Sequence, residues 1–397
     1  MKIEQLRIEN YKVYRQTIIK DLSNFSVFLG ANGAGKTTLF DVFGFLSESL
    51  KSNVKIALNK RGGFREVYSR DGSGPIVIEI KFRNDSIGEE IQPLITYLLE
   101  INQENGVPVV MKEVLKYRRA ERGKPYLFLD FHKGEGNAIT NEEDYSSGQF
   151  AEQREYQKLD SPDILAIKGL GQFQRFKAIS SFRRLLDDWY VSNFQIEDAR
   201  TVEDVGLSEH LSTTGNNLAQ VTRFIKENYP RQFSIILEKF KKRVPGVEDV
   251  EAEETQDGRI ILKFKDGSFK DPFVARFVSS GTIKMFAYLV LLNDPQTHPL
   301  LCVEEPENFL HPDLLMELAE EFREYAQRGG QVFVSTHSPD FVNAIRPKEL
   351  FWLHKEDGKT VVMKATENED VMNLFREGDR LGRLWRQGYL TGSGPNI

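Results

Sequence analysis

The chain has 397 residues, of which 40% are hydrophobic and 28% charged, and its formal net charge is −6. This composition is typical of a folded globular protein, and it excludes a disordered chain, a collagen-like chain and a small disulfide-stapled domain. The single cysteine, Cys302, has no intrachain disulfide partner and fits a reducing compartment. Since no apolar run is long enough to cross a bilayer and the N-terminus lacks a signal-peptide core, we expect a cytoplasmic protein without a membrane partner.

The first part of the chain predicts a sheet-rich region. Alternating or apolar runs indicate strands at 6–9, 16–19, 25–29, 76–82, 94–101, 109–117 and 126–131. The runs after residue 75 predict an antiparallel sheet added to the first strands. Residues 132–160 are polar and contain glycine, so we expect a mobile loop there.

The second part of the chain predicts helices and then a parallel sheet. Residues 161–245 have helical periodicity, but their heptads are not sustained, so no long coiled coil is expected. Strand and helix patterns then follow at 259–265, 282–292, 300–303, 312–327 and 331–335. The last three predict a βαβ unit. A hairpin around Asp357-Gly358 precedes a basic segment that contains Trp385.

A glycine-rich loop joins the strand at 25–29 to the next helix. The segment from Gly30 to Thr37 matches G-x-x-x-x-G-K-[ST] without a gap. Glycines let successive backbone N–H groups surround a phosphate, and the following helix presents its positive end to the same anion. Lys36 would neutralise the β and γ oxygens, and Thr37 would place its hydroxyl on Mg²⁺.

Three further groups fit a nucleotide site. Glu304 and Glu305 follow a buried strand, where one carboxylate can hold Mg²⁺, directly or through water, and the next can polarise the attacking water. His337 follows the neighbouring strand, within reach of a γ-phosphate. The run Ser279-Ser280-Gly281 starts a helix, either as a second anion site or as an ordinary N-cap.

The order of GANGAGKTT, VSSGT, LLCVEEPENFLHP and VFVSTHSPDF resembles the ABC-type ATPase heads of the RecF/SMC/OLD group, nearest to its stand-alone AAA family ATPase branch. The resemblance implies an α/β fold: a two-lobed P-loop ATPase head with a mixed sheet, an antiparallel β addition and a helical insertion, without a long coiled coil. Its implied domains are lobe I (1–145), a helical insertion or lid (146–245), lobe II (246–352) and a C-terminal hairpin with a basic tail (353–397).

The resemblance also implies site roles. The nucleotide-binding Walker A loop would consist of Gly30, Ala31, Asn32, Gly33, Ala34, Gly35, Lys36, Thr37 and Thr38. Mg²⁺ would be held by Thr37, Glu304 and Gln172, with Gln174 as the alternative to Gln172. Glu305 would be the general base, His337 the switch histidine and Lys12 a basic residue near the nucleotide. The signature residues Ser279, Ser280 and Gly281 would act on ATP held by a second copy, with the D-loop at 309–312 crossing the interface.

The expected function is ATP hydrolysis by an ATP-dependent homodimer or higher even-numbered oligomer. The hydrolysis cycle would make the protein a switch, sensor or scaffold for a separately encoded effector, a nuclease or toxin, in bacterial antiphage defence. The alternatives are a RecF-like DNA-binding repair ATPase and a nucleotide-locked scaffold without turnover. Candidate DNA-binding clusters are Lys116, Arg118, Arg119 and Arg122, and Lys239, Lys241, Lys242 and Arg243. About 60 residues follow His337, too few for the nuclease domain of the OLD proteins, so we expect no nuclease.

Overall fold

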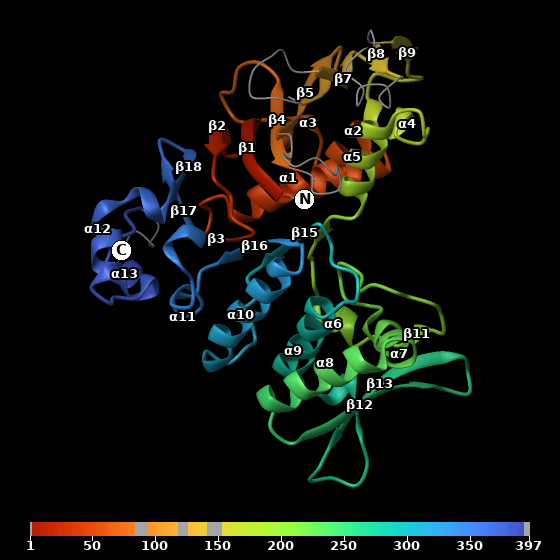
Figure 1. Ribbon diagram of the computed structural model, residues 1–397, viewed down its shortest axis with the longest axis vertical. Coiled ribbons are helices and arrows are strands. Elements are labelled where there is room, and N and C mark those ends of the chain that lie inside the picture. The colour runs from red at the N-terminus through yellow and green to blue at the C-terminus, as the bar shows by residue number, and fades with distance from the viewer. Residues whose placement is uncertain (1, 84–93, 118–125, 141–152, 393–397) are drawn as a thin grey trace. The chain divides into compact units, whose positions relative to one another are not determined.

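The computed structural model describes residues 2–83, 94–117, 126–140 and 153–392 (Figure 1). The chain divides into two units. The first unit combines Met1–Trp189 with Arg346–Ile397, and the second consists of Tyr190–Ile345. The phosphate loop therefore belongs to the first unit, whereas the acidic strand end, the signature run and His337 belong to the second.

The first unit contains an eight-stranded antiparallel sheet in the order β2-β1-β4-β5-β6-β7-β8-β9. Its strands are β1 (Lys2–Tyr11), β2 (Tyr14–Ile19), β4 (Ile76–Arg83), β5 (Leu94–Glu104), β6 (Val107–Tyr117), β7 (Tyr126–His132), β8 (Glu135–Ile139) and β9 (Arg154–Lys158). Alternate residues Leu6 and Ile8 of β1 are buried, as the period of two requires. The predicted antiparallel addition is confirmed.

The prediction of a loop over 132–160 was wrong for its two ends. These ends form β8 and β9, which pair from Glu135–Lys158 to Ile139–Arg154. β9 is an edge strand whose residues alternate between exposed and half-buried, so none of them needs to be apolar. Its polar sequence therefore did not predict a strand. The rest of the predicted loop, 141–152, lies outside the described residues.

Helices line this sheet in the first unit (Figure 1). They are α1 (Lys36–Lys51), α2 (Val54–Asn59), α3 (Phe64–Val67), α4 (Ala166–Leu170) and α5 (Lys177–Asp187). Aromatic rings join α5 to the sheet, since Phe182 stacks on Phe82 at 5.0 Å and lies 4.7 Å from Tyr97 between ring centroids. Such packing anchors the helices that flank the phosphate loop.

A second sheet segment of the first unit carries the phosphate loop. The strand β3 (Phe25–Gly30) is buried throughout and pairs in parallel with β17 (Leu350–Glu356), which pairs antiparallel with β18 (Lys359–Lys364). The hairpin predicted at Asp357-Gly358 is therefore confirmed. The tail beyond it forms two helices that the sequence did not predict, α12 (Glu369–Arg376) and α13 (Leu381–Arg386), and α13 buries Leu381 and Leu384. The short 3-10 turns η3 (Pro347–Glu349) and η4 (Ala365–Glu367) flank this hairpin.

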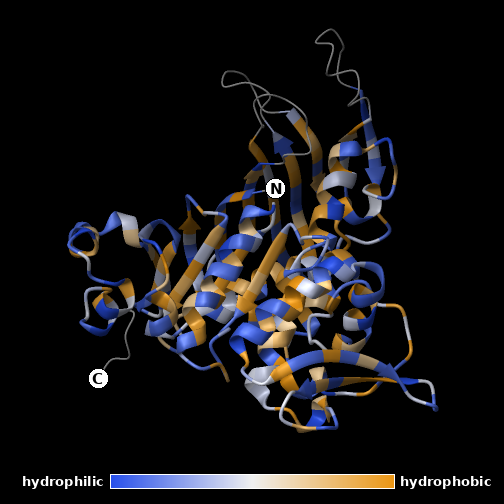
Figure 2. Ribbon diagram, turned by 60° about the horizontal axis from the view of Figure 1, so that its bottom comes forward, coloured by the Kyte–Doolittle hydropathy of each residue, from blue (hydrophilic) through white to orange (hydrophobic). Residues whose placement is uncertain are grey.

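The second unit contains the predicted βαβ unit. The strands β10 (Tyr190–Val191), β15 (Leu300–Glu304) and β16 (Gln331–Thr336) pair in parallel. The helices that accompany them are α9 (Ser280–Leu292), α10 (Asp313–Gln327) and α11 (Pro339–Val342). In Figure 2 the hydrophobic colour concentrates in strands and inner helices, and α9 is buried from Ile283 to Leu292. A helix that is buried on all sides is closely packed against its neighbours, and this packing fixes the position of its N-terminus within the unit.

The remainder of the second unit consists of helices and a small antiparallel sheet. It consists of α6 (Ile196–Ala199), β11 (Glu203–Asp204), α7 (Leu218–Asn228), α8 (Pro230–Arg243), β12 (Val247–Glu254), β13 (Arg259–Asp266), β14 (Phe273–Val274) and the turn η2 (Ala275–Phe277). Phe286 of α9 packs against Phe240 and Phe264, with ring centroids 5.1 and 5.5 Å away. The longest helix among the described residues is α1, with 16 residues, and none of these helices is long and apolar enough to cross a membrane.

Candidate functional site

The loop between β3 and α1 has the backbone of an anion cradle. Gly33 and Gly35 adopt φ angles of 78° and 108°, which only glycine adopts without strain. A Cβ on Gly35 would lie 2.7 Å from Oγ1 of Thr360. Gly35 is also the N-cap of α1 and provides no side chain to cap its first N–H groups. These N–H groups and the helix dipole favour a bound anion.

Lys36 folds back over this cradle. Its Nζ donates to the carbonyl oxygens of Gly30 at 2.6 Å and Ala31 at 3.2 Å, and the residue is only 6% exposed. The ammonium group therefore lies along the loop and is bound to two of its peptide carbonyls. Thr37 follows at the exposed first turn of α1.

Two hydroxyl groups that the sequence analysis missed brace the loop. Tyr14 donates to the carbonyl oxygen of Gly35 at 2.9 Å, and Thr360 donates to that of Ala34 at 2.8 Å. Both hydroxyl groups are buried, so each fixes a peptide plane of the cradle. The sequence gives no signal for Thr360, because it comes from β18, 326 positions after Ala34.

Lys12 is tied to α1 in the structure. Its Nζ lies 2.6 Å from Oδ2 of Asp41, which also accepts from the hydroxyl group of Tyr11 at 2.9 Å and, through Oδ1, from Nε of Arg61 at 2.6 Å. Burial acts to raise the pKa of the Asp41 carboxyl, but the hydrogen bond from Lys12 and the charge of Arg61 hold that pKa below its ordinary value. The nucleotide contact of Lys12 stays a prediction.

The Mg²⁺ role of Gln172 also stays a prediction. Gln172 and its alternative Gln174 both lie exposed in the turn between α4 and α5. Nε2 of Gln172 donates to the carbonyl oxygen of Lys168 at 3.3 Å. The described geometry does not distinguish the two glutamines.

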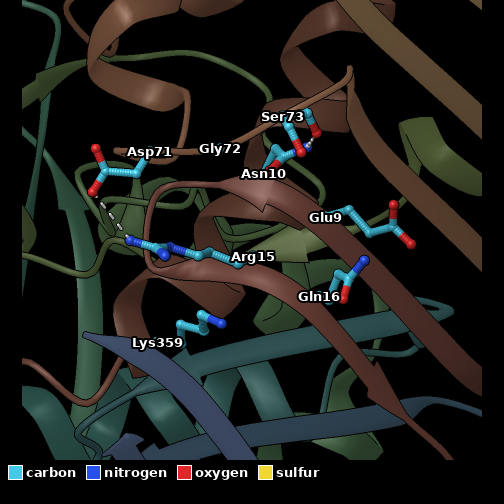
Figure 3. A pocket seen from close by; sticks show the side chains of 8 residues that line it. All are labelled: Glu9, Asn10, Arg15, Gln16, Asp71, Gly72, Ser73 and Lys359. Carbon is cyan, nitrogen blue, oxygen red and sulfur yellow. Dashed lines mark hydrogen bonds and ion pairs between the residues drawn. The ribbon is translucent and has the colours of Figure 1, made fainter. Parts of the chain in front are cut away.

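A polar cavity of about 340 Å³ lies beside the β1–β2 turn (Figure 3). Its lining residues are Glu9, Asn10, Arg15, Gln16, Asp71, Gly72, Ser73 and Lys359. Figure 3 shows Arg15 reaching toward Asp71, with 3.5 Å between Nη2 and Oδ2. None of the predicted site residues lines this cavity, and its carboxylates and cations largely offset one another.

In the second unit, the predicted general base and the switch histidine are in contact. Oε1 of Glu305 lies 3.2 Å from Nδ1 of His337, and Oε2 accepts a hydrogen bond from Nδ2 of Asn308 at 3.0 Å. The backbone N–H of Glu305 donates to the carbonyl oxygen of Ser335 at 2.9 Å, and Glu305 adopts a φ of 43°. A positive φ on a glutamate is uncommon, so the ends of β15 and β16 hold this turn in an unusual shape.

Glu307 is a second carboxylate of this turn, and the sequence analysis gave it no role. It is 8% exposed, and its Oε1 accepts from Oγ1 of Thr336 at 2.6 Å and from the backbone N–H of His337 at 2.9 Å. Its buried Oε2 has no hydrogen-bond partner among the described residues. Glu307 therefore fixes the backbone from which His337 projects. Its signal was the third glutamate of EEPEN, two positions after Glu305.

Lys284 joins the signature helix to the same turn. It is 6% exposed on α9, and its Nζ donates to the carbonyl oxygen of Glu305 at 3.2 Å. Burial lowers the pKa of this ammonium group to about 8, while the charges of Glu307 and Glu305 oppose that shift. The signal in the sequence was a lone lysine inside the apolar run from Ile283 to Leu292.

The signature run starts α9 at the surface. The Ser279 side chain is the N-cap and accepts from the backbone N–H of Thr282 at 3.2 Å. Ser279 is exposed, whereas Ser280 and Gly281 are half-buried. A Cβ on Gly281 would lie 2.6 Å from the carbonyl oxygen of Phe309, so a glycine is required where α9 meets the predicted D-loop. Phe309 itself is 69% exposed.

The fold defines the class of protein. The chain matches a solved SmcHead bound to the C-winged helix domain of ScpA, with a TM-score of 0.55, 16% identity and coverage of 94% of this chain and 100% of that one. It also matches an Smc head domain with an extended coiled coil, bound to the C-terminal domain of ScpA derived from Pyrococcus furiosus, with a TM-score of 0.50, 15% identity and coverage of 94% and 99%. The predicted mixed α/β head fold is confirmed.

The chain belongs to the family described as AAA domain, putative AbiEii toxin, Type IV TA system, which matches residues 25–343. The match includes the phosphate loop, the signature run and the acidic strand end. The chain is accordingly an ATPase, as the phosphate loop predicts.

Three curated relatives agree with this assignment. The Retron Vc95 probable ATPase of Vibrio cholerae serotype O1 biovar El Tor is 21% identical over 93% of this chain and 76% of its own length. The DNA double-strand break repair Rad50 ATPase of Pyrococcus abyssi (strain GE5 / Orsay) is 32% identical over 21% of this chain, and the Old nuclease of Escherichia phage P2 is 22% identical over 44%. The chain spans only 9% of the Rad50 protein and 37% of the Old nuclease. The predicted resemblance to the RecF/SMC/OLD group is confirmed.

Proposed function

We propose that the chain is an ATP-driven switch, in which two copies close around two ATP molecules and hydrolysis opens them again. The observation that carries this proposal is the contact between Glu305 and His337, with 3.2 Å between Oε1 and Nδ1, at the end of β15. A carboxylate held beside an imidazole can orient a water molecule and accept its proton.

The donor atoms of the predicted site suit ATP with Mg²⁺. Thr37 supplies a hydroxyl oxygen and Glu304 a carboxylate oxygen, the hard ligands that Mg²⁺ prefers. The predicted cradle requires glycine at position 35, because a side chain there would clash with Thr360. Bound Mg²⁺ would neutralise charge on the β and γ oxygens. Thr37, Glu304 and either Gln172 or Gln174 would hold it, and Lys12 would lie near the nucleotide.

The residues of the chain would divide the chemistry. Lys36 would leave the carbonyl oxygens of Gly30 and Ala31 for the phosphate oxygens, which bear more charge. Glu305 would take the proton of the attacking water, while Asn308 keeps its carboxylate oriented through the bond to Oε2. His337 would contact the γ-phosphate side of the site.

Exposure of the signature run supports dimerisation. Ser279 starts α9 at the surface, and the neighbouring Phe309 and Phe277 are 69% and 77% exposed. Large exposed aromatic side chains beside an anion-binding helix start favour a protein surface as their partner. We propose that this partner is a second copy whose ATP receives the signature run.

For the output of the switch we propose control of a separately encoded effector, a nuclease or toxin, in antiphage defence. The similarity to the retron ATPase extends over 93% of this chain, and the family description names a toxin of a toxin–antitoxin system. Co-purification from the native host tests this proposal. Recovery of the protein without a stoichiometric partner contradicts it.

DNA binding in the manner of a repair ATPase is the second candidate, supported by the 32% identity to Rad50. Two cations of the α8 cluster do not strengthen it, because Lys239 and Arg243 each lie 2.6 Å from a carboxylate oxygen of Glu321. Of the other cluster, Arg118, Arg119 and Arg122 lie outside the described residues. Stimulation of the ATPase by duplex DNA, falling steeply with salt, would favour this candidate.

The Glu305→Gln variant tests the switch. The amide keeps the shape of the side chain but cannot accept the proton of water, so we expect ATP binding to persist and turnover to fall by about 100-fold or more. Sedimentation with ATP and Mg²⁺ should show a trapped dimer.

Glu324→Gln is the matched control, because this exposed glutamate lies on α10 of the same unit and pairs with Lys239. It should hydrolyse ATP at the wild-type rate. Wild-type turnover by Glu305→Gln would refute the assignment of the base, and a monomer in ATP would refute the dimeric switch.

A further inference from the structure

Arg200, which lies outside the signature run in the sequence, forms hydrogen bonds to this run. It directly follows α6, which packs against α9. Nη2 of Arg200 donates to the carbonyl oxygen of Val278 at 2.7 Å and to Oγ of Ser280 at 3.2 Å. The Arg200 side chain is only 16% exposed. A planar guanidinium group that binds both a backbone carbonyl and a side-chain hydroxyl fixes their relative position.

This contact separates the roles of the two serines. The Ser279 hydroxyl caps α9 by accepting from the backbone N–H of Thr282, and it also lies 2.7 Å from Oγ1 of Thr282. The Ser280 hydroxyl instead accepts from Arg200. A hydroxyl that accepts from a cation retains its own proton as a donor, and the nearby positive charge makes that donor stronger. Ser280 is thus the serine prepared to donate to an anion.

The charge of Arg200 adds to that of the helix start. Its Nη1 lies 3.2 Å from Oε1 of Glu197, but the Glu197 side chain is 84% exposed, so water screens this pair. The buried Nε has no partner among the described residues. The guanidinium charge therefore reinforces the positive end of α9.

We propose that Arg200 is a positioning residue for the ATPase, setting the Ser280 hydroxyl and the Val278 peptide for the γ-phosphate of ATP held by a second copy. The inference rests on the proposed function, because it needs a second copy at the signature run. It assigns a role to a residue 80 positions before the signature. Arg200 acts through Ser280, and its loss should weaken closure of the dimer without weakening nucleotide binding by a single copy.

The first test places Arg200→Ala in the Glu305→Gln background and measures the ATP-dependent dimer by sedimentation. We expect the dimer dissociation constant to rise about tenfold or more, because each copy loses the hydrogen bond from Arg200 that positions its Ser280 hydroxyl for the ATP of the other copy. Arg200→Lys keeps the positive charge but not the planar guanidinium group, so its dimer dissociation constant should lie between those of the Glu305→Gln parent and the Arg200→Ala form. Glu197→Gln removes only the exposed partner and should leave the constant unchanged. A fluorescent ATP analogue should bind all four proteins with equal affinity.

The second test mixes Arg200→Ala with Glu305→Gln before ATP is added. In a mixed dimer, the copy with an intact Glu305 meets the intact Arg200 of the other copy. Turnover should therefore exceed the sum of the two proteins measured separately. A residue with a merely structural role within its own copy would give only that sum.

The outcomes separate the two proposals. If Glu305→Gln alone forms no dimer with ATP, the proposed function fails. If it dimerises and the Arg200→Ala and Arg200→Lys forms dimerise with the same constant, the role of Arg200 is refuted and the switch stands. If Arg200→Ala does not fold, the Arg200→Lys constant decides, and a value equal to that of the parent overturns the inference.

Discussion

At the scale of single residues, Glu113 shows how burial changes the ionisation of a carboxyl group. Glu113 of β6 is fully enclosed, and its carboxylate accepts from the backbone N–H groups of Ala166 and Ile167, at 2.5 and 3.1 Å, and from the hydroxyl of Tyr97 at 3.1 Å. Burial raises the pKa of this carboxyl to about 7, and the three hydrogen bonds only partly counter the rise. Glu113 thereby links the sheet to the start of α4, near the predicted glutamine of the site.

Glu113 should make stability depend on pH. Because the pKa is raised in the folded state, its contribution is fully present below pH 4.5 and is lost as pH rises through about 7. Between these limits the free energy of unfolding should fall by up to about 3 kcal/mol, and Glu113→Gln should remove most of that slope. Urea unfolding at pH 5, 6, 7 and 8 measures it, with the exposed Glu104→Gln as control. An equal slope in Glu113→Gln would contradict the assignment.

Helices and strands with a strong hydrophobic period could be predicted from the sequence. Those that form mainly through contacts with neighbouring elements could not. The strands up to β7, the βαβ unit and the hairpin of β17 and β18 follow from local patterns that tertiary packing reinforces. The edge pair β8 and β9 and the tail helices α12 and α13 are short elements of at most eight residues and carry weak patterns. The phosphate loop is a contiguous motif and could be recognised, whereas Lys284, Glu307 and Arg200 gain their roles only from folding.

Lys284 connects α9 to the turn that holds Glu305, and replacing it should lower ATP turnover. Lys284→Met keeps the length and apolar stem but loses the donor to the Glu305 carbonyl. We expect turnover to fall about tenfold with ATP affinity unchanged, because the turn that holds the base loses its support. Wild-type turnover should also decline as pH rises through about 8, where the ammonium group deprotonates. Lys284→Arg should keep its rate above that pH, and a wild-type rate in Lys284→Met would refute the link.

At the scale of the whole molecule, each unit holds a different part of the predicted chemistry. The first unit is built from both ends of the chain and contains the phosphate loop with its braces. The second unit contains the acidic turn, His337 and the signature run. The sequence order of the motifs could be read directly. The joining of Met1–Trp189 to Arg346–Ile397 could not, because pairing between distant strands leaves no local signal.

A variant of Thr360 tests whether the C-terminal part of the first unit supports the phosphate loop. Thr360→Val preserves the shape of the side chain and removes the hydroxyl that binds the Ala34 carbonyl. A buried carbonyl without its partner costs about 1–3 kcal/mol, so ATP affinity should weaken by about tenfold. Thr360→Ser retains the hydroxyl and should bind like the wild type. Titration with a fluorescent ATP analogue measures both, and equal affinity of the valine form would show that the loop needs no brace.

The brace from Thr360 also has a consequence for synthesis. Ala34 leaves the ribosome long before the threonine that supports it, since 326 positions separate them. A nascent chain that has passed the glycine-rich segment therefore lacks one of the two braces of its cradle until the hairpin of β17 and β18 emerges. Full affinity for ATP should therefore arise only late in translation, so unfinished products should enter the hydrolytic cycle less readily.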